Sequence, residues 1–129
     1  MKLTDLLFYS GTAALLTHEL DAMTHHEWRL LPILKGLPDA TAEPAFVAAH
    51  WPLFVLMLGT AASLNLRLRQ TARDVICAFL VVHAGLHTFF SGDVLYTFSG
   101  TLSQLLIYGA GALGLAYSII RWRESAAPA

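Results

Sequence analysis

Four long apolar stretches within 129 residues are the feature that most constrains this chain. A helix needs about 20 predominantly apolar residues to cross a bilayer, and each stretch approaches or exceeds that length. They predict membrane spans at approximately residues 5–31, 44–66, 72–90 and 101–122. Only 13% of the residues are charged, against about 25% in soluble domains. The sequence therefore predicts a single transmembrane domain over residues 1–129, an all-α integral membrane four-helix bundle.

The charge and cysteine counts exclude several classes of function. A formal net charge of −1 at pH 7 leaves no basic surface of the kind that holds nucleic-acid phosphates. Cys77 is the one cysteine, so the chain has neither an intrachain disulfide nor a Cys-rich metal motif. The partners we expect are the lipid bilayer, a small-molecule or lipid substrate, and a second copy of the chain or a larger membrane complex, with no nucleic acid.

The basic residues predict how the spans are oriented. In a four-span arrangement, Arg29 and Lys35 fall on one side and the other six of the eight fall on the side of both termini. The six are Lys2, Arg67, Arg69, Arg73, Arg121 and Arg123. Because Lys and Arg are enriched in cytoplasmic loops, both termini are predicted to be inside, N-in/C-in. We expect a multi-pass protein of the bacterial inner (plasma) membrane.

The histidines fall at one predicted depth. Three precede the outer end of the first span, one lies early in the second, and two lie in the last turns of the third. All six therefore occupy the outer half of the bundle: His18, His25, His26, His50, His83 and His87. Ionisable groups are costly inside a membrane and mark functional sites by default. The sequence thus predicts a polar site that faces the external or periplasmic side.

Helical spacing indicates which groups on the first span face inward. At 100° per residue, His18, Asp21 and His25 fall within about 60° of one another. The same strip carries the small residues Gly11 and Ala22. Small residues let a neighbouring helix approach, so this strip is expected to face the bundle interior. The spacing leaves open whether residues 23–31 lie in the membrane or at its surface.

The third span carries the spacing of a metal site. His83 and His87 are four residues apart, so one helix face offers two imidazoles to one ion. The candidate metal ligands are His18, Asp21, His25, His50, His83 and His87. Imidazole and carboxylate donors without thiolates favour a transition metal, with zinc or iron first. Glu19 and Glu27 are the candidate catalytic groups, as partners of the ligands or as a general base.

The predicted function is a multi-pass membrane protein with a His/carboxylate transition-metal site, and the corresponding enzyme class is a metal-dependent hydrolase or oxidoreductase. One alternative is a membrane protein that binds haem b through His50 and His83, since facing helices can supply two axial imidazoles. Another is a non-catalytic accessory subunit or a proton- or ion-conducting subunit, because histidines titrate near neutral pH.

The fourth span carries a pattern that resembles a dinucleotide fingerprint. Gly109, Gly111 and Gly114 match G-x-G-x-x-G. The pattern lies in the middle of a span with no preceding strand, so the structural context of the fingerprint is missing. We interpret these glycines as a small-residue face that packs against another helix.

A resemblance to known proteins rests on the first span. The run His18-Glu19-Leu20-Asp21-Ala22, followed by Glu27-Trp28-Arg29, resembles an uncharacterised family of small bacterial four-span integral membrane proteins. The resemblance implies a location in a membrane. A looser likeness is to the HXXEE group of small membrane proteins.

Overall fold

The computed structural model describes residues 1–126. It contains four α-helices: α1 (Leu3–Thr24), α2 (Asp39–Ala61), α3 (Leu66–Phe90) and α4 (Thr101–Ala126). A short 3-10 helix, η1 (Glu27–Arg29), follows α1, and residues 1–126 contain no strand. The predicted all-α helical bundle is confirmed.

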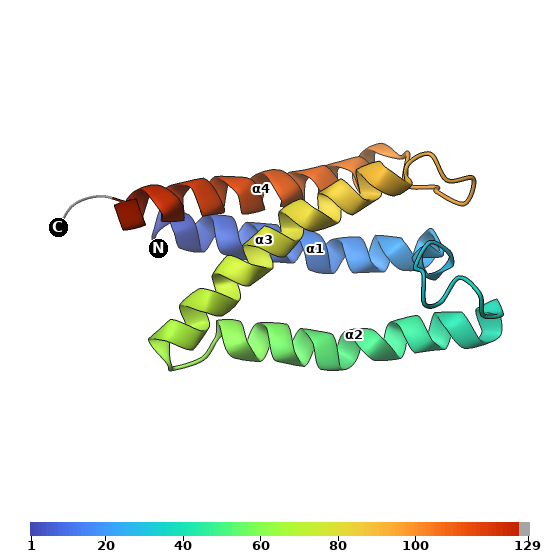
Figure 1. Cartoon of the computed structure of the whole chain (residues 1–129), viewed down its shortest axis with the longest axis horizontal. Helices are drawn as coiled ribbons and strands as arrows, with labels where there is room; N and C mark the ends of the chain where they lie inside the picture. Colours follow the sequence, from blue (N-terminus) through green and yellow to red (C-terminus); the bar gives the residue numbers. More distant parts are fainter. Residues whose placement is uncertain (127–129) are drawn as a thin grey trace.

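The helices form a core of three with the fourth set apart. Figure 1 shows α1 and α4 running side by side, α3 crossing them obliquely, and α2 lying apart. α4 packs along both α1 and α3, whereas α2 packs mainly against α3 and η1. The start of α1, the end of α4 and the α2–α3 turn share one end of the molecule, and the other two connections share the opposite end. Successive helices therefore run in opposite directions.

Glycines allow α3 and α4 to pack closely. A Cβ added to Gly111 would lie 2.7 Å from the Cβ of Ala84. A Cβ added to Gly114 would overlap the backbone carbonyl oxygen of Cys77. Gly109 differs, because no such atom of the described chain lies within 4 Å of a Cβ added there. The packing face predicted on the fourth span is thus confirmed at Gly111 and Gly114 and is wrong at Gly109, which lies off the contact with α3.

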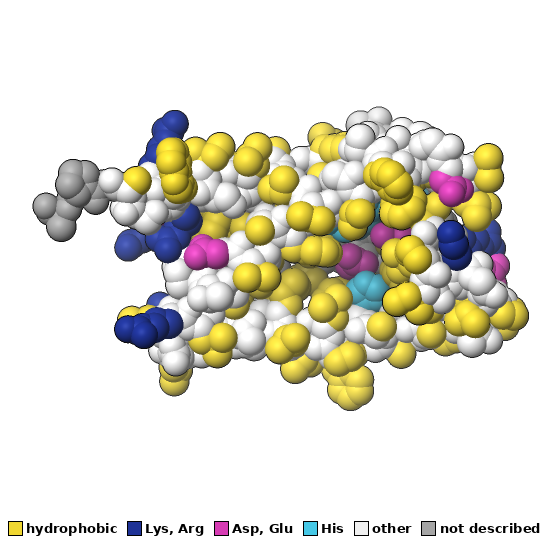
Figure 2. All heavy atoms as spheres, in the orientation of Figure 1, with side chains coloured by type: hydrophobic (Ala, Val, Ile, Leu, Met, Phe, Trp, Pro, Cys, Tyr) yellow, Lys and Arg dark blue, Asp and Glu magenta, His cyan; other side chains and the backbone are white. Residues whose placement is uncertain are grey.

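The apolar helices and their exposed hydrophobic side chains indicate a membrane protein. Within the described part of the chain, three helices are long and apolar enough to cross a membrane: α2, α3 and α4. α1, which carries Asp5, Glu19 and Asp21, is not among them. Large hydrophobic side chains such as Trp51 and Leu56 are exposed. Figure 2 shows hydrophobic side chains over the middle of the molecule and Lys and Arg at its two ends, as expected for a bilayer environment.

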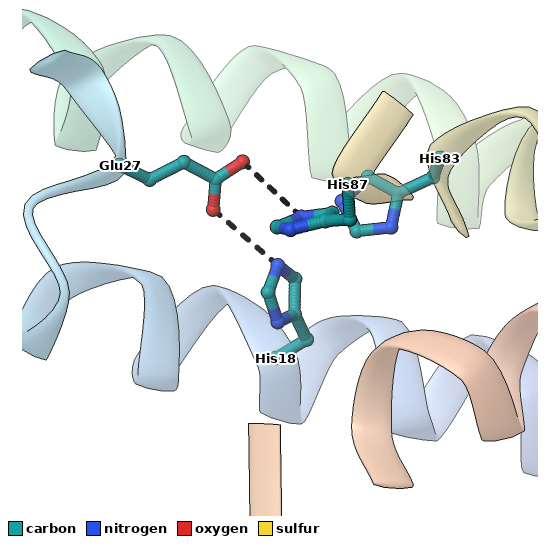
Figure 3. Close-up of side chains that lie close together, drawn as sticks. All are labelled: His18, Glu27, His83 and His87. Atoms are coloured by element: carbon teal, nitrogen blue, oxygen red, sulfur yellow. Dashed lines mark ion pairs between the residues drawn. The ribbon is translucent and has the colours of Figure 1, made fainter. Parts of the chain in front are cut away.

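The first helix ends earlier than the predicted range 5–31. α1 stops at Thr24, and the exposed His26 adopts a left-handed backbone with φ 54° and ψ 47°. That conformation costs a residue with a side chain about 1 kcal/mol or more. It reverses the direction of the chain, so Glu27 leaves the path of the helix and points back into the bundle (Figure 3).

A set of polar contacts joins η1 to the start of α2. Trp28 is buried, and its Nε1 donates a hydrogen bond of 3.0 Å to Oδ1 of Asp39. The Arg29 guanidinium forms an ion pair with the same carboxylate. We call Trp28, Arg29 and Asp39 the η1 clasp. The clasp holds in place the turn that the left-handed residue begins.

Candidate metal centre

Four side chains from three elements meet where α1 leads into η1 (Figure 3). His18 comes from α1, Glu27 from η1, and His83 and His87 from α3. One potential ligand atom of each lies within 4.8 Å of those of the other three. The three imidazoles are buried, and the Glu27 side chain is 13% exposed. This group, the His/Glu cluster, could hold a metal ion.

Helix geometry brings the three imidazoles together. His83 and His87 lie one turn apart on α3, with ring centroids 4.6 Å apart. His18 lies on a face of α1 where Gly11 and Ala22 are also buried, as predicted. Its ring centroid is 4.9 Å from each of the other two, edge to face. The packing of α1 against α3 therefore brings His18 next to the His83/His87 pair, and the three imidazoles form one site.

The Glu27 carboxylate faces imidazoles from two helices. Its Oε2 lies 3.3 Å from Nε2 of His18, and its Oε1 lies 3.7 Å from Nε2 of His87. Two ligands held at about 2.1 Å on one tetrahedral zinc ion are about 3.4 Å apart. The observed separations are close to this value, so small side-chain movements would bring the donors into a coordination shell.

Buried polar atoms in the cluster lack hydrogen-bond partners. Among the 126 residues that the structure describes, Nδ1 of His18 and Nδ1 of His83 have none, and Nε2 of His18 and Oε2 of Glu27 face each other as an ion pair without hydrogen-bond geometry. More than 90% of buried polar groups in proteins are hydrogen-bonded, because an unpaired one costs about 1–3 kcal/mol. A cation could bind one nitrogen of each imidazole together with the carboxylate. The donor set fits a borderline-soft transition ion such as zinc or iron.

Two residues of the α3–α4 connection support the cluster. The Tyr96 hydroxyl lies 3.3 Å from Nδ1 of His87. Its oxygen can accept a hydrogen bond from Nδ1–H, which leaves Nε2 free to bind a metal. Burial raises the pKa of Tyr96 to about 12, so the phenol stays neutral at physiological pH. Phe98 is fully buried, and its ring centroid lies 4.9 Å from that of His87 and 5.5 Å from that of His18. Both residues restrict the orientation of the imidazoles.

Two predicted ligands lie together in a neighbouring group. Nε2 of His25 lies 3.5 Å from Oδ1 of Asp21, one helical turn earlier. Nδ1 of His25 lies 2.9 Å from the Thr97 hydroxyl, and Nε2 lies 3.3 Å from the Ser103 hydroxyl. His25 therefore joins α1 to α4 and to the α3–α4 connection, and its contacts engage both ring nitrogens.

The remaining predicted residues, His50 and Glu19, pair across the gap between α2 and α1. Nε2 of His50 lies 2.9 Å from Oε2 of Glu19, and Nδ1 lies 2.7 Å from the carbonyl oxygen of Phe46. A carbonyl oxygen only accepts, so Nδ1 carries a proton. The 2.9 Å distance lets a proton on either Nε2 or the carboxylate form a hydrogen bond to the other atom. Both ring nitrogens are engaged, so the pair can exchange a proton but offers no free nitrogen to haem.

A cavity of about 790 Å³ adjoins the His/Glu cluster, bounded by α2, α3 and parts of α1 and η1. Most of its lining is apolar, from Leu53 and Phe54 on α2 to Val75 and Phe79 on α3. Its ionisable lining residues within the described chain are Glu19, Glu27, His50, His83 and His87. Figure 2 shows a hollow with His and acidic side chains at its floor. We call this space the α2/α3 cavity.

Comparison with known proteins gives a family without an assigned activity. The model of a family of unknown function, DUF6713, matches residues 4–124. The chain belongs to this family. The match includes every residue of the His/Glu cluster and of the cavity lining. Searches of curated proteins and of solved structures gave no match.

Sequence reasoning missed how Glu27 and Phe98 contribute to the site. On a continuous helix Glu27 would face away from His18, and only the reversal at His26 turns it inward. Phe98 belongs to the α3–α4 connection, where an aromatic residue carries no spacing signal. Long-range contacts made by the folded chain determine both positions.

Proposed function

We propose that this protein is a membrane metalloprotein whose transition-metal ion, zinc or iron, is held by His18, Glu27, His83 and His87. The observation that carries the proposal is the convergence of four potential ligand atoms within 4.8 Å of one another in the His/Glu cluster, where ring nitrogens of His18 and His83 lack hydrogen-bond partners. Three imidazoles and one carboxylate form a donor set that biological zinc and iron sites use. Neither nucleic-acid binding nor a role for the single cysteine is part of the proposal.

We further propose that the centre is catalytic and that its chemistry is hydrolytic. An ion held by the four residues would need a fifth, open coordination position for catalysis, and through that position it could polarise a carbonyl group or lower the pKa of a water molecule. The His50–Glu19 pair, at hydrogen-bond distance, would give the cavity a group that can accept and return a proton beside the cluster. In this assignment Asp21 and His25 act structurally by joining α1 to α4.

The proposed location is a bacterial inner membrane, with α1 as the fourth span and both termini in the cytoplasm. Basic residues near the α2–α3 turn and near the end of α4 support this orientation. The polar face of α1 is compatible with a span because His18 is buried by protein and would not face lipid. The cluster would then open toward the periplasmic side.

Metal analysis tests the proposal directly. Protein purified in mild detergent is expected to carry about one zinc or iron ion per chain, and the His83→Ala/His87→Ala variant is expected to carry none. His26→Asn is the matched control, because His26 is exposed and lies outside the cluster, and asparagine tolerates the left-handed backbone that this position requires. If wild type and double variant both lack stoichiometric metal, the proposal is wrong. A Soret band in the absorption spectrum would instead favour the haem alternative.

A further inference from the structure

The α2/α3 cavity extends far beyond the metal centre. On α3 its lining residues run from His83 back to Leu68, which is about 22 Å of helix at 1.5 Å per residue. One leaflet of a bilayer contributes about 15 Å of hydrocarbon, half of the roughly 30 Å core. The cavity is therefore long enough for an extended acyl chain. Its volume of about 790 Å³ lies within the range of about 300–1,000 Å³ typical of ligand pockets.

Polarity within the cavity is strongly asymmetric. Toward the α2–α3 turn the walls are apolar, with Leu56 and Met57 on α2 facing Ala72 and Ile76 on α3. The ionisable lining residues all lie in the other half of the cavity, around the His/Glu cluster and the His50–Glu19 pair, with apolar residues such as Leu34 and Phe90 beside them. A molecule that matches this pattern has a long hydrocarbon tail and one polar head.

The polar end also selects the kind of head group. It offers imidazoles, the hydrogen-bonded His50–Glu19 pair and, in the proposed function, a metal cation. An acyl carbonyl or carboxylate oxygen is complementary to a cation and to a proton donor. A quaternary ammonium head would instead meet a cation and a histidine cluster, which disfavours it.

We propose that the α2/α3 cavity binds one long-chain acyl compound, a fatty acid or its ester or amide. Its tail lies between α2 and α3, and its carbonyl lies at the His/Glu cluster. The position of the carbonyl rests on the proposed metal centre, whereas binding of the tail depends only on the cavity. The proposal names long-chain acyl compounds as the substrate class of the site. Such a compound would enter the cavity from the lipid phase, between α2 and α3.

The test uses spin-labelled stearic acid, with the nitroxide near its methyl end, added to the protein in phosphatidylcholine nanodiscs. Wild type is expected to give an immobilised spectral component that saturates at about one label per chain. Palmitate should displace the label and butyrate should not. Ala49→Phe, which fills the cavity from α2, is expected to weaken binding by about tenfold or more. Ala48→Phe is the matched control, because the neighbouring Ala48 is exposed and does not line the cavity.

A second cavity-filling variant, Ala72→Phe, repeats the test from the α3 wall in case Ala49→Phe does not fold. The proposal is overturned if the label does not saturate, or if Ala48→Phe weakens binding as much as Ala49→Phe, since either result describes bulk lipid. It is also overturned if wild type is dimeric by light scattering and Ala49→Phe makes it monomeric, since a second copy then covers the cavity. Saturable binding by protein that lacks metal would sustain the tail site and refute the metal centre. Metal-loaded protein without saturable binding would support the metal centre and refute the tail site.

Discussion

The contact between α3 and α4 yields a prediction with a matched control on the same helix. At Gly114 a methyl group would meet the Cβ of Leu80 at 2.9 Å and the backbone carbonyl of Cys77 more closely still. At Gly109 it would meet no such atom of the described chain within 4 Å. Alanine in place of glycine stabilises a helix by up to about 1 kcal/mol, and this gain applies to both positions. Overpacking costs about 1–3 kcal/mol and applies only to Gly114.

The difference between the two variants isolates the packing cost. We expect Gly114→Ala to have a free energy of unfolding about 1–3 kcal/mol below that of Gly109→Ala, because a backbone carbonyl cannot move aside as a side-chain tip can. The assay is SDS-driven unfolding in mixed micelles, followed by circular dichroism. Equal unfolding midpoints for Gly109→Ala and Gly114→Ala would refute the close approach of α3 and α4.

Three further predictions concern the site and its orientation. Glu27→Gln keeps the side-chain volume but removes the negative charge and the carboxylate ligand. Zinc affinity should fall by about 10–100-fold or more, the loss typical when a partner of a metal ligand is removed. Asp21→Asn should leave zinc affinity unchanged, and an equal loss in both variants would contradict the assignment. Tyr96→Phe removes the oxygen beside Nδ1 of His87 and should weaken zinc binding by about tenfold, measured by competition with a chelator, whereas an unchanged affinity would mean that Tyr96 does not support the ligand. In a cysteine-free background, Lys35→Cys should react with a membrane-impermeant maleimide added to intact cells and Arg67→Cys should not; the opposite pattern would reverse the proposed orientation.

The fold was largely predictable because hydrophobic runs of membrane-spanning length are an unambiguous pattern. The predicted ranges 44–66, 72–90 and 101–122 overlap α2, α3 and α4. The end of the first helix was not predictable. It depends on a left-handed His26, and the contacts that hold η1 in place come from Asp39, which lies 13 residues further along the chain.

The candidate site was predictable in part. Helical spacing placed His83 beside His87 and put His18 on an inward face, and these three imidazoles do meet. Spacing along one helix does not specify how far apart two helices lie. α2 stands away from the α1–α3–α4 core, and His50 reaches Glu19 across the cavity that both residues line. The sequence contains no direct signal for that distance.

The η1 clasp connects the position of α2 to the position of Glu27. Glu27, which faces the buried imidazoles, is the immediate neighbour of Trp28, and Trp28 is tied to the first residue of α2. α2 is also one wall of the cavity and packs mainly at its two ends, against η1 and α3. A movement of α2 away from α3 would therefore pull, through the η1 clasp, on the segment that carries the Glu27 carboxylate. If the cavity admits an acyl compound and the cluster binds a metal ion as proposed, the η1 clasp would couple the two events.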